Sequence, residues 1–86
     1  MWTLLYSTRA ANTMRKLDKT VAWRIRSYLD AVLITKDPRS RGKGLTGPLS
    51  GYWCYRIGDY RAIVSIEDDR MTIIAIDIAH RSTVYQ

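Results

Sequence analysis

The sequence predicts an α+β fold: an N-terminal strand, a helical hairpin and then a three-stranded antiparallel meander, with both helices packed on one face of a twisted antiparallel sheet. Three observations predict it. Apolar residues recur at helical spacing between residues 18 and 36, alternating runs flank a Gly-Asp pair at 58–59, and residues 71–78 are apolar on both faces. We expect residues 1–86 to form a single domain, because this length supports a sheet and one or two helices.

The first half of the chain supplies the strand and the helical hairpin. Trp2–Tyr6 is predicted to be a short strand, and a first helix is expected to begin near Ser7 or Thr8. A second helix is expected from about Asp18, a good N-cap, to about Lys36, where Asp37-Pro38 ends it. Its apolar stripe consists of Val21, Ile25, Tyr28, Leu29, Val32 and Leu33. Trp23 lies opposite this stripe, either as a half-buried surface aromatic or as part of a partner-binding face.

A glycine-rich segment separates the helices from the remaining strands. Residues 39–51 hold four of the five glycines, so they are predicted to form a loop. The loop is either a plain connector or, through Arg39, Arg41 and Lys43, an extension of a basic surface. The last strand, Met71–Ile78, follows an acidic turn and should be an interior strand because both of its faces are apolar.

The hairpin between these segments brings two arginines together. Gly58 at the first central position suits a two-residue type II′ turn, which places Ile57 opposite Tyr60 and Arg56 opposite Arg61. Like charges at a directly opposed pair destabilise a sheet. Either an anion is held between the two guanidinium groups, or the side chains extend into water or pair with carboxylates.

The strand register also divides the hairpin into two faces. The residues that serve the helix-covered face are Trp53, Tyr55, Ile57, Tyr60, Ala62 and Val64. Cys54, Arg56, Arg61 and Ile63 then point to a second face that we expect to be largely open. Arg81 and Tyr85, just beyond the last strand, are placed where they can fold over that same face.

Composition restricts the classes of function. A net charge of +6 and a pI near 9.8 favour a polyanionic partner, either nucleic acid or an acidic protein segment, although charge can also serve solubility alone. No apolar run approaches the roughly 20 residues that cross a bilayer, and Met1–Ser7 lacks the pattern of a signal peptide, so we expect a cytoplasmic protein without membrane contact. One cysteine, Cys54, and one histidine, His80, supply neither a disulfide nor a zinc site, and we expect no cofactor.

Three blocks together resemble the RelE/ParE superfamily of toxin-antitoxin toxins, and its RelE branch more closely. They are Gly44-Leu45-Thr46-Gly47, Tyr55-Arg56-Ile57-Gly58-Asp59-Tyr60-Arg61 and His80-Arg81-Ser82-Thr83-Val84-Tyr85. The resemblance implies a RelE-like fold over nearly the whole chain. It also implies a metal-independent, ribosome-dependent endoribonuclease that cleaves messenger RNA and inhibits translation.

The resemblance assigns roles to individual residues. Arg56 and Arg61 match basic residues of the family's active-site sheet, Arg81 its phosphate-binding arginine and Tyr85 its C-terminal tyrosine. Lys43 is a looser match, and Arg39 and Arg41 would extend RNA binding along the loop. Tyr85 and His80 are the candidates for proton transfer, and Tyr85 can instead stack on a base. Cys54 departs from the family, in which many members carry Arg or Lys.

The resemblance also implies partners: a cognate acidic antitoxin, the ribosome with its messenger RNA, and operator DNA only indirectly through the antitoxin. We expect the antitoxin to lie against the sheet and helices. Two other functions stay open. One is a ParE-like poison of DNA gyrase, and the other is a catalytically weak toxin that acts mainly as an antitoxin-binding co-repressor.

Overall fold

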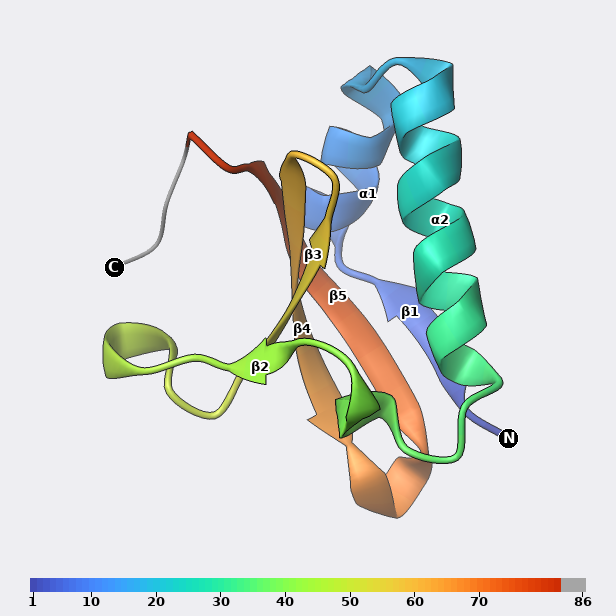
Figure 1. The fold of residues 1–86 in the computed structure, drawn as a ribbon, viewed down its shortest axis with the longest axis vertical. Coiled ribbons are helices and arrows are strands. Elements are labelled where there is room, and N and C mark those ends of the chain that lie inside the picture. The colour runs from blue at the N-terminus through green and yellow to red at the C-terminus, as the bar shows by residue number, and fades with distance from the viewer. Residues whose placement is uncertain (83–86) are drawn as a thin grey trace.

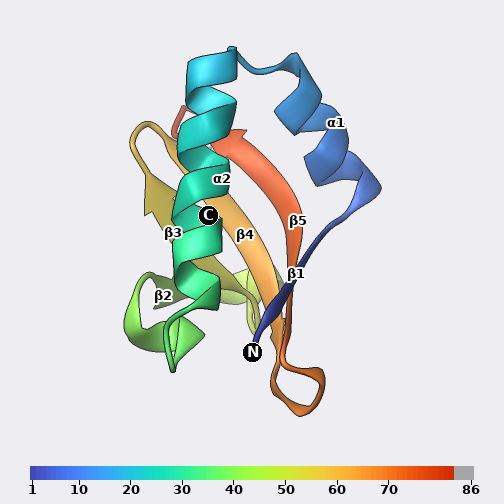
Figure 2. The ribbon, with the colours of Figure 1, turned by 90° about the vertical axis from the view of Figure 1, so that its right-hand side faces the viewer.

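The computed structural model describes residues 1–82 as two α-helices on one face of a five-stranded sheet (Figures 1 and 2). The elements are β1 (Thr3–Tyr6), α1 (Thr8–Lys16), α2 (Lys19–Leu33), β2 (Lys43–Gly44), β3 (Trp53–Ile57), β4 (Tyr60–Glu67) and β5 (Thr72–His80). Short 3-10 turns lie at Pro38–Ser40, Gly47–Leu49 and Asp68–Arg70. Neither helix in this part of the chain has the length and hydropathy needed to cross a membrane.

The sheet has the strand order β1-β5-β4-β3-β2. The predicted antiparallel meander of β3, β4 and β5 is confirmed, and β5 is an interior strand as expected. The sheet as a whole is mixed rather than antiparallel, because β1 pairs with β5 in parallel. This pairing depends on contacts far apart in sequence: the Ser7 N–H donates to the Ala75 carbonyl at 2.9 Å and the Ser7 hydroxyl donates to that of Ile76 at 2.9 Å.

Both helices begin at the residues that the sequence indicates. The Ser7 hydroxyl accepts from the Ala10 N–H at 3.0 Å, and the Asp18 carboxylate accepts from the Thr20 N–H at 3.0 Å. Helix α2 ends at Leu33, short of the predicted Lys36. The Thr35 hydroxyl donates to the Val32 carbonyl at 2.6 Å. A side-chain donor therefore occupies a carbonyl of the last helical turn that a backbone N–H would bond if the helix continued.

The hairpin has the predicted register at every position from Trp53 opposite Val64 to Ile57 opposite Tyr60. Gly58 has a φ of +58° at the first central position of the turn, which a type II′ turn requires and which glycine adopts without steric cost. Strand β5 runs to His80, two residues beyond the predicted end, because its pairing with β4 continues to Tyr60 opposite His80.

The core fills the space between the helices and the sheet. Its buried members include Ile25 and Leu29 of α2, Tyr55 of β3 and Val64 of β4. The opposite face is less open than predicted, since Cys54 is only 5% exposed and Ile63 only 2%. Both are flanked by cross-strand neighbours on that face, Lys43 opposite Cys54 and Asp77 opposite Ile63. The loop between β2 and β3 also extends from the sheet away from the helices (Figure 1).

Candidate functional site

A polar pocket of about 250 Å³ lies at the end of the sheet where the β3–β4 hairpin turns. Its lining consists of Arg56, Gly58, Tyr60, Arg61 and Arg81. These residues come from β3, from the turn, from β4 and from the position directly after β5. The hairpin turn and the end of β5 therefore bring three of the predicted site arginines to one pocket.

Arg56 and Arg61 face each other across the β3–β4 ladder, as predicted. Within residues 1–82, no carboxylate lies at ion-pair distance from either guanidinium group. Pairing with carboxylates from that part of the chain is thereby excluded as the reason why the opposed charges are tolerated. Two guanidinium groups on adjacent strands, neither paired with a carboxylate of residues 1–82, form a site suited to a phosphate or another oxyanion.

Arg81 is fixed to the hairpin turn through Asp59. Its backbone N–H donates to the Asp59 carbonyl at 2.7 Å, and its Nε lies 3.7 Å from Asp59 Oδ1. The Arg81 side chain is nevertheless 70% exposed, so its guanidinium remains accessible to a ligand. The turn thus sets the position of the third arginine, which follows β5 directly.

Cys54 lies on the arginine face but is buried, contrary to the expectation of an open position. Burial raises the pKa of the Cys54 thiol, while the charges of Arg61, Lys43 and Arg56 act in the opposite direction. The thiol is therefore neutral near pH 7 and unsuited to act as a nucleophile. Lys43 lies opposite Cys54 and adds a basic side chain to this face.

His80 does not line the arginine pocket. It lies opposite Tyr60, with ring centroids 5.1 Å apart in an edge-on contact, and the Ser82 N–H donates to its Nδ1 at 3.2 Å. Tyr85, the other predicted proton-transfer residue, lies outside the described residues. The pocket as described supplies positive charge and no group that exchanges a proton readily near pH 7.

The structure does not bring Arg39 and Arg41 to the pocket. Arg39 makes a bidentate pair with Asp68, with both N···O distances 2.9 Å, at the other end of β4. The Arg41 guanidinium lies 5.4 Å from the centre of the Tyr28 ring on α2, and so on the helix side of the sheet. Both residues are charged and exposed, but neither extends the surface of Arg56 and Arg61.

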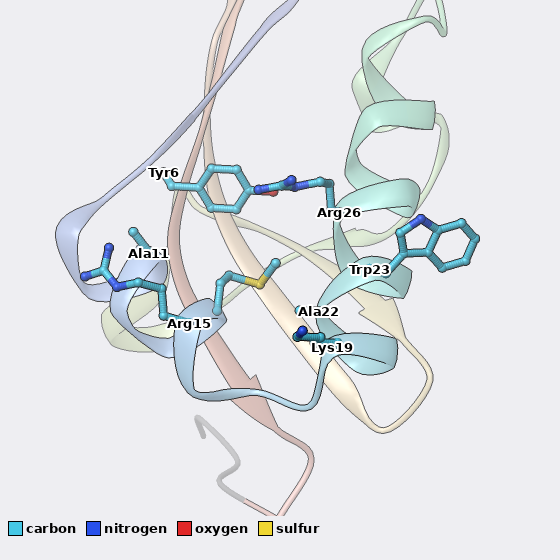
Figure 3. A pocket seen from close by; sticks show the side chains of 8 residues that line it. Tyr6, Ala11, Arg15, Lys19, Ala22, Trp23 and Arg26 are labelled. Carbon is cyan, nitrogen blue, oxygen red and sulfur yellow. The ribbon is translucent and has the colours of Figure 1, made fainter.

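A second, larger pocket of about 410 Å³ lies between α1 and α2 (Figure 3). We call it the interhelical groove, and its lining is Tyr6, Ala11, Met14, Arg15, Lys19, Ala22, Trp23 and Arg26. The Tyr6 hydroxyl is buried, and its ring points toward the Arg26 side chain (Figure 3). Burial raises the pKa of Tyr6.

The sequence did not predict this groove. Its only signal was the position of Trp23 away from the apolar stripe, and Trp23 is indeed 68% exposed. The small residues Ala11 and Ala22, one on each helix, leave the space between the helices, and such facing pairs become visible only when the helices are placed together. Residues 1–82 contain no group of three or more His, Cys, Asp or Glu side chains arranged to hold a metal ion.

Comparison with known proteins identifies the family. Residues 4–85 match the family described as the ParE toxin of the type II toxin-antitoxin system, parDE. The chain is 26% identical over 85 residues to "Toxin RelG" of Mycobacterium tuberculosis, covering 99% of this chain and 97% of that protein. It is 31% identical over 77 residues to "Toxin RelE" of the same organism, covering 90% and 78%, respectively.

Solved structures agree on the fold. A chain of the RelBE2 toxin-antitoxin complex from Mycobacterium tuberculosis superposes with a TM-score of 0.84 at 26% identity, covering 94% of this chain and 92% of that one. The isolated E. coli RelE toxin gives a TM-score of 0.76 at 21% identity, with 93% and 84% covered. The predicted α+β fold, with the helices on one face of the sheet, is thereby confirmed. The chain belongs to the ParE toxin family and is a RelE-like toxin of a type II toxin-antitoxin system.

Proposed function

We propose that this toxin is an endoribonuclease that cleaves messenger RNA on the ribosome. The observation that carries the proposal is the convergence of Arg56, Arg61 and Arg81 on one pocket. Guanidinium groups bind phosphate through paired hydrogen bonds and keep their charge at every physiological pH. A pocket lined by three of them suits a phosphodiester that gains negative charge during reaction.

The reaction proposed is attack by an RNA 2′-hydroxyl on the adjacent phosphorus. The bond from phosphorus to the 5′-oxygen of the next nucleotide breaks, and a 2′,3′-cyclic phosphate remains. Charge accumulates on the phosphoryl oxygens in the transition state, and preorganised donors stabilise it without reorganising. Because the guanidinium groups supply the positive charge that stabilises these oxygens, the proposed chemistry does not require a metal ion.

Proton transfer needs other groups, because arginine does not release its proton readily. Tyr85 and His80 are the proposed candidates for removing the 2′-hydroxyl proton and protonating the leaving oxygen. His80 contacts Tyr60, which itself lines the pocket, but the strand register places His80 and Tyr60 on the face of the sheet opposite to Arg56 and Arg61. Comparing Tyr85→Phe with His80→Gln in single-turnover cleavage assigns the role to the residue whose loss lowers the rate more.

Few groups in the pocket transfer protons, so we expect the ribosome to supply much of the catalysis by holding messenger RNA in a reactive geometry. Purified toxin should cut messenger RNA on programmed ribosomes and leave free RNA largely intact, as read by primer extension. Cleavage that is absent with folded protein, together with gyrase-dependent DNA breaks, would replace this proposal with that of a gyrase poison. Absence of both activities, with antitoxin binding retained, would leave the co-repressor function.

We also propose that the partner is an acidic antitoxin. The structure of RelBE2 from Mycobacterium tuberculosis is a toxin-antitoxin complex, and that of RelB-RelE from Methanococcus jannaschii is an antitoxin-toxin complex. In this chain, the interhelical groove combines an apolar floor with the charges of Arg15, Lys19 and Arg26, which suits an acidic amphipathic segment that orders on binding. The antitoxin, in turn, would make the contacts to operator DNA.

Charge reversal at the groove tests this partner. Lys19→Glu and Arg15→Glu should each weaken binding of the acidic protein encoded next to the toxin, measured by titration calorimetry of co-expressed and separated partners. Lys36→Glu makes the same charge change at an exposed position outside the groove and serves as the matched control. Equal losses in all three variants would show that net charge, rather than the groove, governs binding.

A further inference from the structure

We propose that Asp59 is a positioning residue that orients Arg81 toward a phosphate held by Arg56 and Arg61. The inference rests on the proposed function, and it assigns to the hairpin turn a role beyond reversing the chain direction. Asp59 is the second central residue of the β3–β4 turn, directly after Gly58. Its backbone carbonyl accepts from the Arg81 N–H, and its carboxylate lies at ion-pair distance from the Arg81 guanidinium.

The two contacts have separate effects. The hydrogen bond of 2.7 Å from the Arg81 N–H to the Asp59 carbonyl fixes where the Arg81 side chain begins. The carboxylate, with Oδ1 3.7 Å from Arg81 Nε, then favours guanidinium orientations in which the Nε edge faces the turn. A guanidinium carries five donors in a planar fork, so the two terminal nitrogens stay available for a bidentate contact to phosphate.

Charge also favours this arrangement. The pocket gathers three guanidinium groups, and among residues 1–82 Asp59 is the one carboxylate at ion-pair distance from any of them. Arg81 follows the strand end and lacks the cross-strand partners that hold Arg56 and Arg61 in the ladder. A carboxylate at the turn offsets part of the repulsion that would otherwise drive Arg81 away from the other two.

Stability alone does not explain the pair. The side chains of Arg81 and Asp59 are 70% and 65% exposed, and an exposed ion pair contributes little to the free energy of unfolding. Replacing the carboxylate should therefore leave the fold unchanged. Asparagine keeps the shape of the residue and is well tolerated in turns, so Asp59→Asn removes only the charge.

The first experiment compares Asp59→Asn with Asp68→Asn. Asp68 is an exposed aspartate in the turn at the other end of β4, where it pairs with Arg39, so the control makes the same change in net charge away from the pocket. We expect Asp59→Asn to lower the single-turnover cleavage rate at saturating ribosome complex by about tenfold, less than the roughly 10²-fold that a misplacement of about 1 Å can cost. The half-saturating concentration should stay within about twofold, since an exposed ion pair adds little binding. Equal rates for the two variants would overturn the proposal.

The second experiment repeats Asp59→Asn in an Arg81→Ala background. If Asp59 acts through Arg81, its substitution should have no further effect on the cleavage rate there. The same loss in both backgrounds would show that Asp59 acts on substrate or on the turn independently, and would contradict a positioning role.

The third experiment does not depend on cleavage. Arginine Nε–H resonances are followed by NMR while inorganic phosphate is titrated into the wild-type protein and the two aspartate variants. We expect phosphate to shift Arg56, Arg61 and Arg81 together in wild type and in Asp68→Asn, and to lose its effect on Arg81 alone in Asp59→Asn. If wild type does not cleave messenger RNA but this pattern holds, the proposed function fails and the positioning role stands. An unchanged Arg81 response in Asp59→Asn would overturn the positioning role.

Discussion

At the scale of single residues, Arg81 differs from the other two pocket arginines in how the fold holds it. Arg56 and Arg61 lie within β3 and β4, where the ladder orders their backbones, whereas Arg81 follows β5 and is held by contacts to Asp59. Its side chain is largely exposed and has no part in the core. Its contribution to function can therefore be separated from its contribution to stability.

Replacing Arg81 with Ala should lower the single-turnover cleavage rate about 10²-fold or more, the effect of losing one preorganised transition-state donor. The melting temperature should change little. Arg70→Ala is the matched control, because Arg70 in the turn before β5 is also an exposed arginine that pairs with a carboxylate, that of Glu67. An Arg81→Ala protein that fails to fold, or one that cleaves as well as Arg70→Ala, contradicts the assigned role.

Tyr55 makes the stability of the fold sensitive to pH in the alkaline range. Its ring is fully buried, its hydroxyl donates to the Pro38 carbonyl at 2.6 Å, and burial raises its pKa to about 12. An unfolded tyrosine titrates near pH 10, so the stabilising difference is fully present below about pH 10 and is lost as the pH rises toward 12.

The free energy of unfolding from urea titration should therefore fall between about pH 10 and 12. Tyr55→Phe should remove much of this dependence and cost about 1 to 3 kcal/mol at neutral pH, because the Pro38 carbonyl loses its partner. Tyr52→Phe is the control, since Tyr52 is exposed. A pH dependence that is equal in wild type and Tyr55→Phe would show that other groups cause it.

At the scale of elements, glycines allow the backbone to turn and to approach strand β3 closely. Gly42 has a φ of +77°, and a Cβ at this position would lie 2.3 Å from the Cys54 carbonyl oxygen. Gly58 has a φ of +58°, but a Cβ there would meet only Arg24 Nη1, at 3.7 Å. Gly44 in β2 has no positive φ and would make an ordinary contact with Trp53 at 3.5 Å.

Alanine should therefore destabilise the fold most at Gly42, less at Gly58 and least at Gly44. Gly58→Ala should cost about 1 to 2 kcal/mol from the left-handed backbone alone. Gly42→Ala should cost more because steric overlap adds to the strain. Gly44→Ala should stay within about 0.5 kcal/mol of wild type. Urea unfolding of the three proteins measures the order, and a Gly44→Ala loss as large as that of Gly42→Ala would contradict it.

At the scale of the whole molecule, basic residues lie on both sides of the sheet. Arg56, Arg61 and Arg81 surround one pocket, while Arg15, Lys19 and Arg26 line the interhelical groove. The net charge of +6 is therefore divided between two basic clusters, one on each side of the sheet, and each can attract an anionic partner.

Association with the acidic antitoxin should slow about tenfold or more between low and physiological salt, because the screening length for exposed charges shrinks from about 30 Å at 0.01 M salt to about 8 Å at 0.15 M. Dissociation should change less, since it depends on desolvated contacts. Stopped-flow binding at several salt concentrations separates the two rates. An association rate independent of salt would show that charge does not guide the encounter.

The sequence by itself determined the features that depend on neighbours along the chain. Helix periodicity and the N-cap Asp18 located the second helix, and the Gly58 turn fixed the register that opposes Arg56 and Arg61. These are local effects, because a turn or a cap acts within a few residues. The motif blocks identified the family, and the arginines that they indicated do share a pocket.

Only the tertiary structure decided what depends on residues far apart in sequence. Packing across the sheet decides three features. These are the parallel pairing of β1 with β5, the burial of Cys54 and Ile63, and the pairing of Arg39 with Asp68 away from the arginine pocket. The groove between α1 and α2 likewise exists only once the helices are docked. No local pattern carries this information, because a strand's partner and a side chain's burial are set by the surfaces that the rest of the chain brings to it.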